Sequence, residues 1–70
     1  MKKFDSSNTI YIKKCGFSTF IGFDRDIRNE FKIGDVIQIA QATSTPNLLT
    51  YYYDVKVITI YKKCIRTYII

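Results

Sequence analysis

Hydrophobic and polar side chains alternate along several short segments of this chain, with the two-residue period of a strand that has one wet face. In residues 9–14, Ile10 and Ile12 alternate with Tyr11 and Lys13, and successive side chains of a strand point to opposite faces. Further segments of strand character are residues 17–21, 36–41, 51–61 and 64–70. The pattern therefore predicts about five strands.

One segment departs from this period and predicts a short helix at residues 24–31. Asp24 can accept hydrogen bonds from the free amides of a first turn, and Asp26 complements the positive end of the helix dipole. Ile27 and Phe31 are four residues apart, so both would lie on one face. Because so short a helix depends on packing, we expect that face to lie against the sheet.

Composition places the chain in the mainly β class (α+β). Thirty-three of the 70 residues are β-branched or aromatic, and such side chains suit a pleated, half-buried surface. A chain of this length has room for one core. We expect a flexible, polar N-terminus at residues 1–8 and one small domain over residues 9–70, a barrel-like antiparallel sheet with the single helix.

Glycine and proline mark the connections between these segments. Gly16 indicates a turn or a bulge, and Gly34 can adopt a positive φ in the turn before the strand at residues 36–41. Residues 42–47 read as the clearest loop, because small polar side chains surround the only proline.

The chain offers little for catalysis or metal binding. It contains two cysteines, Cys15 and Cys64, and no histidine, so the commonest general base is absent and neither thiol has a histidine to activate it. No C-x-x-C pair suggests zinc. We therefore expect no catalytic residue, no metal and no cofactor, and hence no enzyme.

The N-terminal residues and the apolar stretches indicate a cellular compartment. The first residues lack the apolar run of a signal peptide, and no apolar stretch is long enough to span a membrane. We expect a cytoplasmic protein with reduced thiols and no membrane partner. A disulfide between Cys15 and Cys64 is the alternative, since it would stabilise so small a fold.

The charge favours an acidic partner. The formal net charge is +5, and on so small a protein this points to nucleic acid. Lysines outnumber arginines eight to three, which suits phosphate contacts better than the reading of guanine. The candidate binding residues are Lys13, Lys14, Arg25, Arg28, Lys32, Lys62, Lys63 and Tyr52.

These cations would form one patch if the strands that end at Lys13–Lys14 and before Lys62–Lys63 are neighbours, with the helix extending it. The alternative is that charged strand ends keep the sheet soluble and protect its edge. Tyr52 is likewise open to two interpretations. It lies on the opposite face from Tyr51 and Tyr53, where an exposed ring suits base stacking and equally a protein interface.

Residues 31–37 and 55–61 resemble ASCH domains of the PUA-like superfamily. The first segment is a hydrophobic-Gly-Asp turn that leads into an alternating strand, and the second is the strand Val55-Lys56-Val57-Ile58-Thr59-Ile60-Tyr61. The similarity covers about residues 25–63. It implies a small β-barrel with a basic cleft for RNA.

A second segment looks like the AbrB type of swapped-hairpin DNA-binding domain. Ile27-Arg28 on a short helix is followed by Ile33-Gly34-Asp35 and a strand. That family places Gly-Arg and a proline just before the helix, and this chain has Asp24 where the proline belongs. The resemblance would imply DNA as the ligand.

The sequence thus predicts a non-catalytic nucleic-acid-binding domain, with RNA slightly favoured over DNA. The alternative is a small virus- or plasmid-encoded interaction protein that binds and modulates a host protein, since a composition rich in Ile, Lys and Tyr is common in AT-rich genomes. Both are compatible with a homodimer in which Tyr68-Ile69-Ile70 pairs with a second copy.

Overall fold

The computed structural model describes residues 2–42 and 50–70. Within these ranges the chain forms six strands and no helix, so no helix there could cross a membrane. The strands are β1 (Lys3–Phe4), β2 (Tyr11–Cys15), β3 (Ser18–Gly22), β4 (Val36–Ala42), β5 (Thr50–Ile60) and β6 (Cys64–Ile69). The predicted mainly β class is confirmed. Of the predicted loop at residues 42–47, all but Ala42 lies outside the described residues.

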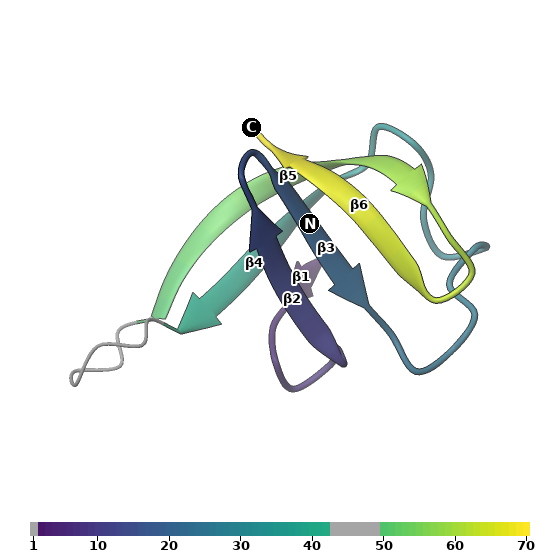
Figure 1. Cartoon of the computed structure of the whole chain (residues 1–70), viewed down its shortest axis with the longest axis horizontal. Coiled ribbons are helices and arrows are strands. Elements are labelled where there is room, and N and C mark those ends of the chain that lie inside the picture. Colours follow the sequence, from purple (N-terminus) through teal and green to yellow (C-terminus); the bar gives the residue numbers. More distant parts are fainter. Residues whose placement is uncertain (1, 43–49) are drawn as a thin grey trace.

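All six strands belong to one sheet in the order β1-β4-β5-β6-β3-β2. Neighbouring strands are antiparallel except for β1, which runs parallel to β4. The sheet curls into a half-barrel whose open side lies between β2 and the edge formed by β1 and β4 (Figure 1). In the long strand β5, the register shifts between Val57 and Thr59, and a bulge of this kind increases the local twist.

The concave face of the half-barrel holds the core. Alternate residues of the central strands, among them Ile21, Val57 and Ile65, are fully buried there. Phe4, Phe23 and Phe31 pack on them as a triangle of rings whose centroids are 5.6, 5.6 and 5.7 Å apart. Two of these rings come from the segment between β3 and β4, which therefore covers the inner face of the sheet.

The predicted helix at residues 24–31 is wrong. A single turn remains, in which the Glu30 amide donates to the Ile27 carbonyl at 3.0 Å. The Ile27 amide donates instead to the Lys62 carbonyl at 2.9 Å, and the Asp26 carboxylate accepts from the Arg28 amide at 3.1 Å. Tertiary and side-chain bonds thus replace the helical ladder. Ile27 and Phe31 are nevertheless both buried against the sheet, as their spacing required.

The sixth strand comes from residues that were expected to be flexible. The Gln38 amide donates to the Lys2 carbonyl at 2.9 Å, which aligns β1 beside β4, and the Phe4 side chain is buried in the core. The Asp5 carboxylate then accepts from the Ser7 amide at 2.8 Å and turns the chain towards β2. The flexibility expected of residues 1–8 stays a prediction.

Two further expectations depend on strand order. β6 lies between β5 and β3, so both of its edges are paired within the chain and offer no edge to a second copy. Cys64 is level with Gly22, and therefore with Tyr11, whereas Cys15 lies four residues further along β2. Four residues correspond to about 13 Å along a strand, which exceeds the reach of a disulfide. Both thiols are free.

We expect Ile27→Ala to destabilise the fold by about 2–5 kcal/mol, because it removes a fully buried side chain from between the loop and the sheet. Ile33→Ala, in the same connection but 64% exposed, is the matched control and should change stability by less than about 0.5 kcal/mol. Urea unfolding followed by circular dichroism measures both. Equal effects of the two substitutions would show that the segment does not seal the core.

Candidate functional site

The predicted cations do not form one patch. β3 and β6 lie between β2, which carries Lys13 and Lys14, and β5, which precedes Lys62 and Lys63. The turn between β5 and β6 also lies beyond the start of β2, whereas the first lysine pair lies towards its other end. The two strands that the prediction required to be neighbours are therefore separated, and so are the two lysine pairs.

Strand alternation also separates Lys13 from Lys14. Lys13 is on the outer, convex face of the sheet, opposite Phe20. Lys14 points to the inner side, where its ammonium lies 5.5 Å from the centroid of the Tyr53 ring. Tyr53 in turn stacks on Tyr51, with centroids 5.7 Å apart.

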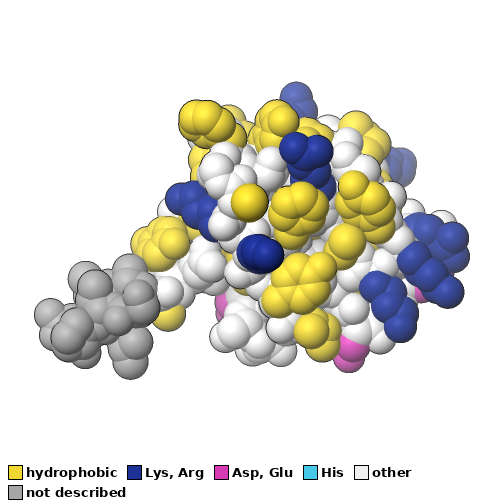
Figure 2. Space-filling view, viewed as in Figure 1, with side chains coloured by type: hydrophobic (Ala, Val, Ile, Leu, Met, Phe, Trp, Pro, Cys, Tyr) yellow, Lys and Arg dark blue, Asp and Glu magenta, His cyan; other side chains and the backbone are white. Residues whose placement is uncertain are grey.

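The predicted arginines already have carboxylate partners. Nε and Nη2 of Arg25 both donate to the Glu30 carboxylate at 2.9 Å, and Nε of Arg28 donates to Asp26 at 3.0 Å. Hydrogen bonds from Arg28 lower the pKa of Asp26 from its ordinary 3.8 to about 2, with a smaller contribution from the charge of Lys62. Acidic side chains accordingly lie beside the basic ones at this end of the molecule (Figure 2).

The remaining predicted residues lie at separate places. Lys32 is exposed in the turn before β4, where its amide donates to the Asp35 carboxylate at 2.9 Å. Lys63 is in the β5–β6 turn, and its carbonyl accepts from the Phe23 amide at 2.8 Å. Tyr52 is on the outer face of β5, with the Lys3 ammonium 5.4 Å from its ring centroid.

The outer face of the central strands gathers a different set of cations and aromatic rings. We call this set the outer platform; it consists of Tyr11, Lys13, Phe20, Lys56, Arg66 and Tyr68. Lys13 lies opposite Phe20, and Phe20 lies opposite Arg66. In the neighbouring row, Tyr68 lies opposite Lys56. Apolar side chains cover β2, β3 and β6 in this view, with basic side chains among them (Figure 2).

Arg66 is the centre of the outer platform. The carbon of its guanidinium is 5.9 Å from the Phe20 centroid and 5.6 Å from the Tyr68 centroid. Its Nε and Nη2 both lie 3.4 Å from the hydroxyl of Ser18, which accepts from them on the floor of the face. The guanidinium is thus within cation–π distance of two rings and has no carboxylate partner within the described residues.

A hollow beside Phe20 extends the outer platform towards β2. It has a volume of about 480 Å³ and is lined by Tyr11, Lys13, Cys15 and Phe20. The Tyr11 ring crosses Gly22, where a Cβ atom would lie only 2.0 Å from Cε2 of the ring. Glycine therefore allows this ring to lie against the sheet. Burial raises the pKa of Tyr11, and the neighbouring Cys64 thiol raises it further.

The charge of the outer platform is uniformly positive. β2, β3 and β6 carry no acidic residue, and the nearest acid along β5 is Asp54, opposite Gln38. No group of three or more metal-binding side chains occurs in residues 2–42 or 50–70. The arrangement is suited to holding an anion that carries flat rings.

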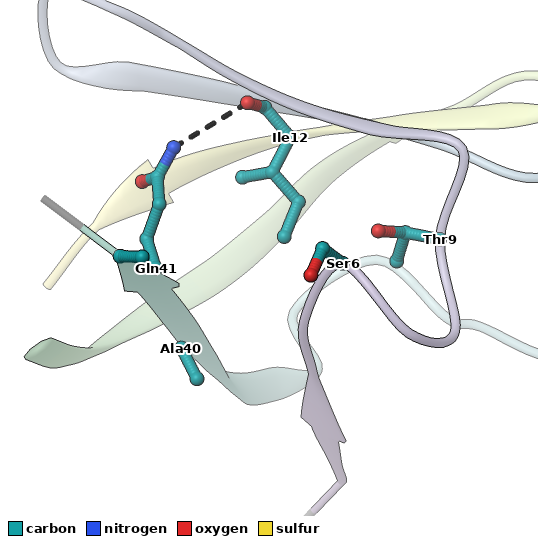
Figure 3. A pocket seen from close by; sticks show the side chains of 6 residues that line it. Ser6, Thr9, Ile12, Ala40 and Gln41 are labelled. Atoms are coloured by element: carbon teal, nitrogen blue, oxygen red, sulfur yellow. Dashed lines mark hydrogen bonds between the residues drawn. The ribbon is translucent and has the colours of Figure 1, made fainter. Parts of the chain in front are cut away.

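The open side of the half-barrel is bridged by Gln41 on β4. Its amide nitrogen donates to the Ile12 carbonyl of β2 at 3.4 Å, and its amide oxygen accepts from the Tyr53 hydroxyl at 2.8 Å. A pocket of about 260 Å³ lies next to this bridge, and its lining also includes Ser6, Thr9, Ala40 and Ala42 (Figure 3). The pocket presents no charged side chain, so it is less suited to an anion than the outer platform.

Sequence reasoning did not name Tyr11, Phe20, Lys56, Arg66 or Tyr68 as candidate site residues. The signal was present for the last two, because Arg66 and Tyr68 alternate with Ile65, Thr67 and Ile69 and so had to share one face of a strand. The sequence did not show which strand lies beside β6. Strand order, which brings Phe20 beside Arg66, has no local sequence signal.

Comparisons with protein-family models, with curated proteins and with solved structures find no match to this chain. The resemblances to ASCH and AbrB-type domains therefore stay predictions. The functional interpretation depends on the geometry of the site.

The pairing of Asp26 with Arg28 has a measurable consequence at low pH. A folded-state pKa of about 2, below the ordinary 3.8, means that this pair stabilises the fold fully above pH 3.8 and progressively less as pH falls through 2. A carbon-detected NMR titration should give that value, and Arg28→Gln should return the pKa of Asp26 towards 3.8. A native Asp26 that titrates near its ordinary value would show that the arginine is free.

Proposed function

We propose that this chain binds single-stranded nucleic acid, RNA ahead of DNA, on the outer platform and without catalysing a reaction. The observation that carries the proposal is the Arg66 guanidinium beside the Phe20 and Tyr68 rings, 5.9 and 5.6 Å from their centroids. Lys13 on one side and Lys56 on the other extend the positive charge across the face.

Both components of the outer platform match a single strand. Aromatic rings and guanidinium planes stack on unpaired bases, at about 1–3 kcal/mol per base for aromatic stacking, and lysines neutralise the adjoining phosphates. A duplex buries the faces of its bases, so the rings of Phe20 and Tyr68 would have nothing to stack on. Sequence-specific RNA recognition generally uses unpaired bases in this way, which favours RNA.

The remaining predicted cations take secondary roles in this proposal. Lys62 and Lys63 lie in the β5–β6 turn and Lys32 in the turn before β4, where they can attract a strand that extends beyond the outer platform. Arg25 and Arg28 are paired with carboxylates. A phosphate would have to displace those partners, so these two arginines should contribute less.

We expect Arg66→Gln to weaken binding of a labelled oligouridylate by about tenfold, because stacking and one phosphate contact are lost together. The slope of log K against log salt should fall by about 0.7. Arg66→Lys keeps the charge, so the slope should persist while affinity falls. Fluorescence anisotropy at several salt concentrations measures both quantities.

Arg25→Gln is the matched control, since it removes the same charge from a paired guanidinium, and it should change affinity by less than about twofold. Thermal unfolding monitored by circular dichroism confirms that each variant is folded. Equal losses of affinity in Arg66→Gln and Arg25→Gln would show that overall charge, and not the outer platform, determines binding. Absence of binding at low salt would refute the proposed function.

A protein partner is the second candidate function, and one observation favours it. Phe17 lies at the tip of the β2–β3 hairpin with 85% of its surface exposed. Gly16, with φ of 63°, allows the tight turn, and the Phe17 carbonyl accepts from the Ile69 amide at 3.2 Å. An aromatic side chain on a fixed hairpin is typical of an interface anchor, as the predicted interaction protein would need.

A further inference from the structure

We infer that the outer face carries a second stacking site, formed by Lys3 and Tyr52, and that one single strand spans this site and the outer platform. The inference rests on the proposed function and specifies its ligand. The ligand would be a chain of several nucleotides rather than a mononucleotide or a dinucleotide.

The second site repeats the chemistry of the first. The Lys3 ammonium is 5.4 Å from the Tyr52 centroid, and 57% of the tyrosine surface is exposed. Lys3 lies opposite Gln38, and Tyr52 lies opposite Ala40. The small side chain of Ala40 therefore leaves the Tyr52 ring uncovered on this side.

A hollow of about 310 Å³ adjoins the Tyr52 ring. Its lining includes the hydroxyl-bearing residues Ser6, Ser7 and Thr50, which can donate to or accept from a ribose or a base edge. Asp5 also lines it, but its carboxylate already accepts from the Ser7 amide at 2.8 Å and from the Ser7 hydroxyl. These hydrogen bonds lower the pKa of Asp5.

The two sites share one face of β5. Tyr52, Asp54 and Lys56 alternate along that strand, and Lys56 lies opposite Tyr68 of the outer platform. Lys56 is four positions further along β5 than Tyr52, which corresponds to about 13 Å. A stacked strand rises about 3.4 Å per nucleotide, so about five nucleotides are enough to reach from one site to the other.

The charges along β5 determine how a nucleic-acid strand passes from Tyr52 to Lys56. Lys3 and Lys56 attract phosphates at the two ends of this interval, whereas the exposed Asp54 carboxylate lies between them. A phosphate opposite Asp54 would be repelled, so the strand must turn a base towards it. A base N–H group, such as N3–H of uracil, can donate to that carboxylate.

Two linked sites bind a long strand more tightly than either binds alone, because the second contact becomes intramolecular. Affinity should therefore rise steeply with length until both sites are filled. For oligouridylates of about two to eight nucleotides, we expect a rise of at least tenfold between about two and six nucleotides. Anisotropy or calorimetry at low salt gives this length profile.

Tyr52→Ala should flatten that profile and lower the affinity for the shortest oligonucleotide by no more than about twofold, since the outer platform still binds it. Tyr51→Ala is the matched control: it removes the same side chain one position away, on the opposite face, where the ring stacks on Tyr53. The steep rise should persist in this variant. Circular dichroism confirms that both variants are folded.

Two results would overturn the inference. A rise in the Tyr52→Ala protein that equals the wild-type rise would remove the second site while leaving the proposed function in place. A wild-type profile that is flat from the shortest oligonucleotide would do the same. Failure of the wild-type protein to bind any length at low salt would remove the proposed function as well.

Discussion

Burial of the concave face is the constraint on which the rest of the structure depends. Once Ile21 and Ile65 are enclosed between the sheet and the segment that follows β3, alternation forces Phe20 and Arg66 onto the convex face. A slip of one residue in either strand would exchange buried and exposed side chains. The apolar packing that stabilises the fold therefore also determines the composition of the outer platform.

The segment that covers the core illustrates how far local sequence reasoning reaches. The four-residue spacing of Ile27 and Phe31 correctly indicated that both face the sheet, because burial requires only that their side chains share a side. It did not require a helix. The Ile27 amide bonds to Lys62, which is remote in the sequence, and no local pattern encodes such a bond. β1 was missed for a related reason, since a strand of two residues is too short for alternation to be visible.

Strand order limited the prediction of the site in the same way. Alternation showed which residues of each strand share a face, but not that β3 and β6 lie between β2 and β5. The expected lysine patch assumed otherwise. The pairing of Arg25 with Glu30 likewise depends on a loop conformation that the helix prediction excluded. Arg66, which seemed an ordinary strand residue, gains its importance from neighbours that are distant in the sequence.

The distribution of charge explains why stacking has to contribute to the binding that we propose. The arginines of the loop after β3 form ion pairs with several carboxylates. The net positive charge of the protein therefore comes mainly from the lysines and Arg66. The outer platform itself contains three cations, Lys13, Lys56 and Arg66. Contacts with about three phosphates give weak, salt-sensitive attraction. Under the proposed function, useful affinity therefore requires rings that stack on bases, and a nucleic-acid strand long enough to meet more than one of them.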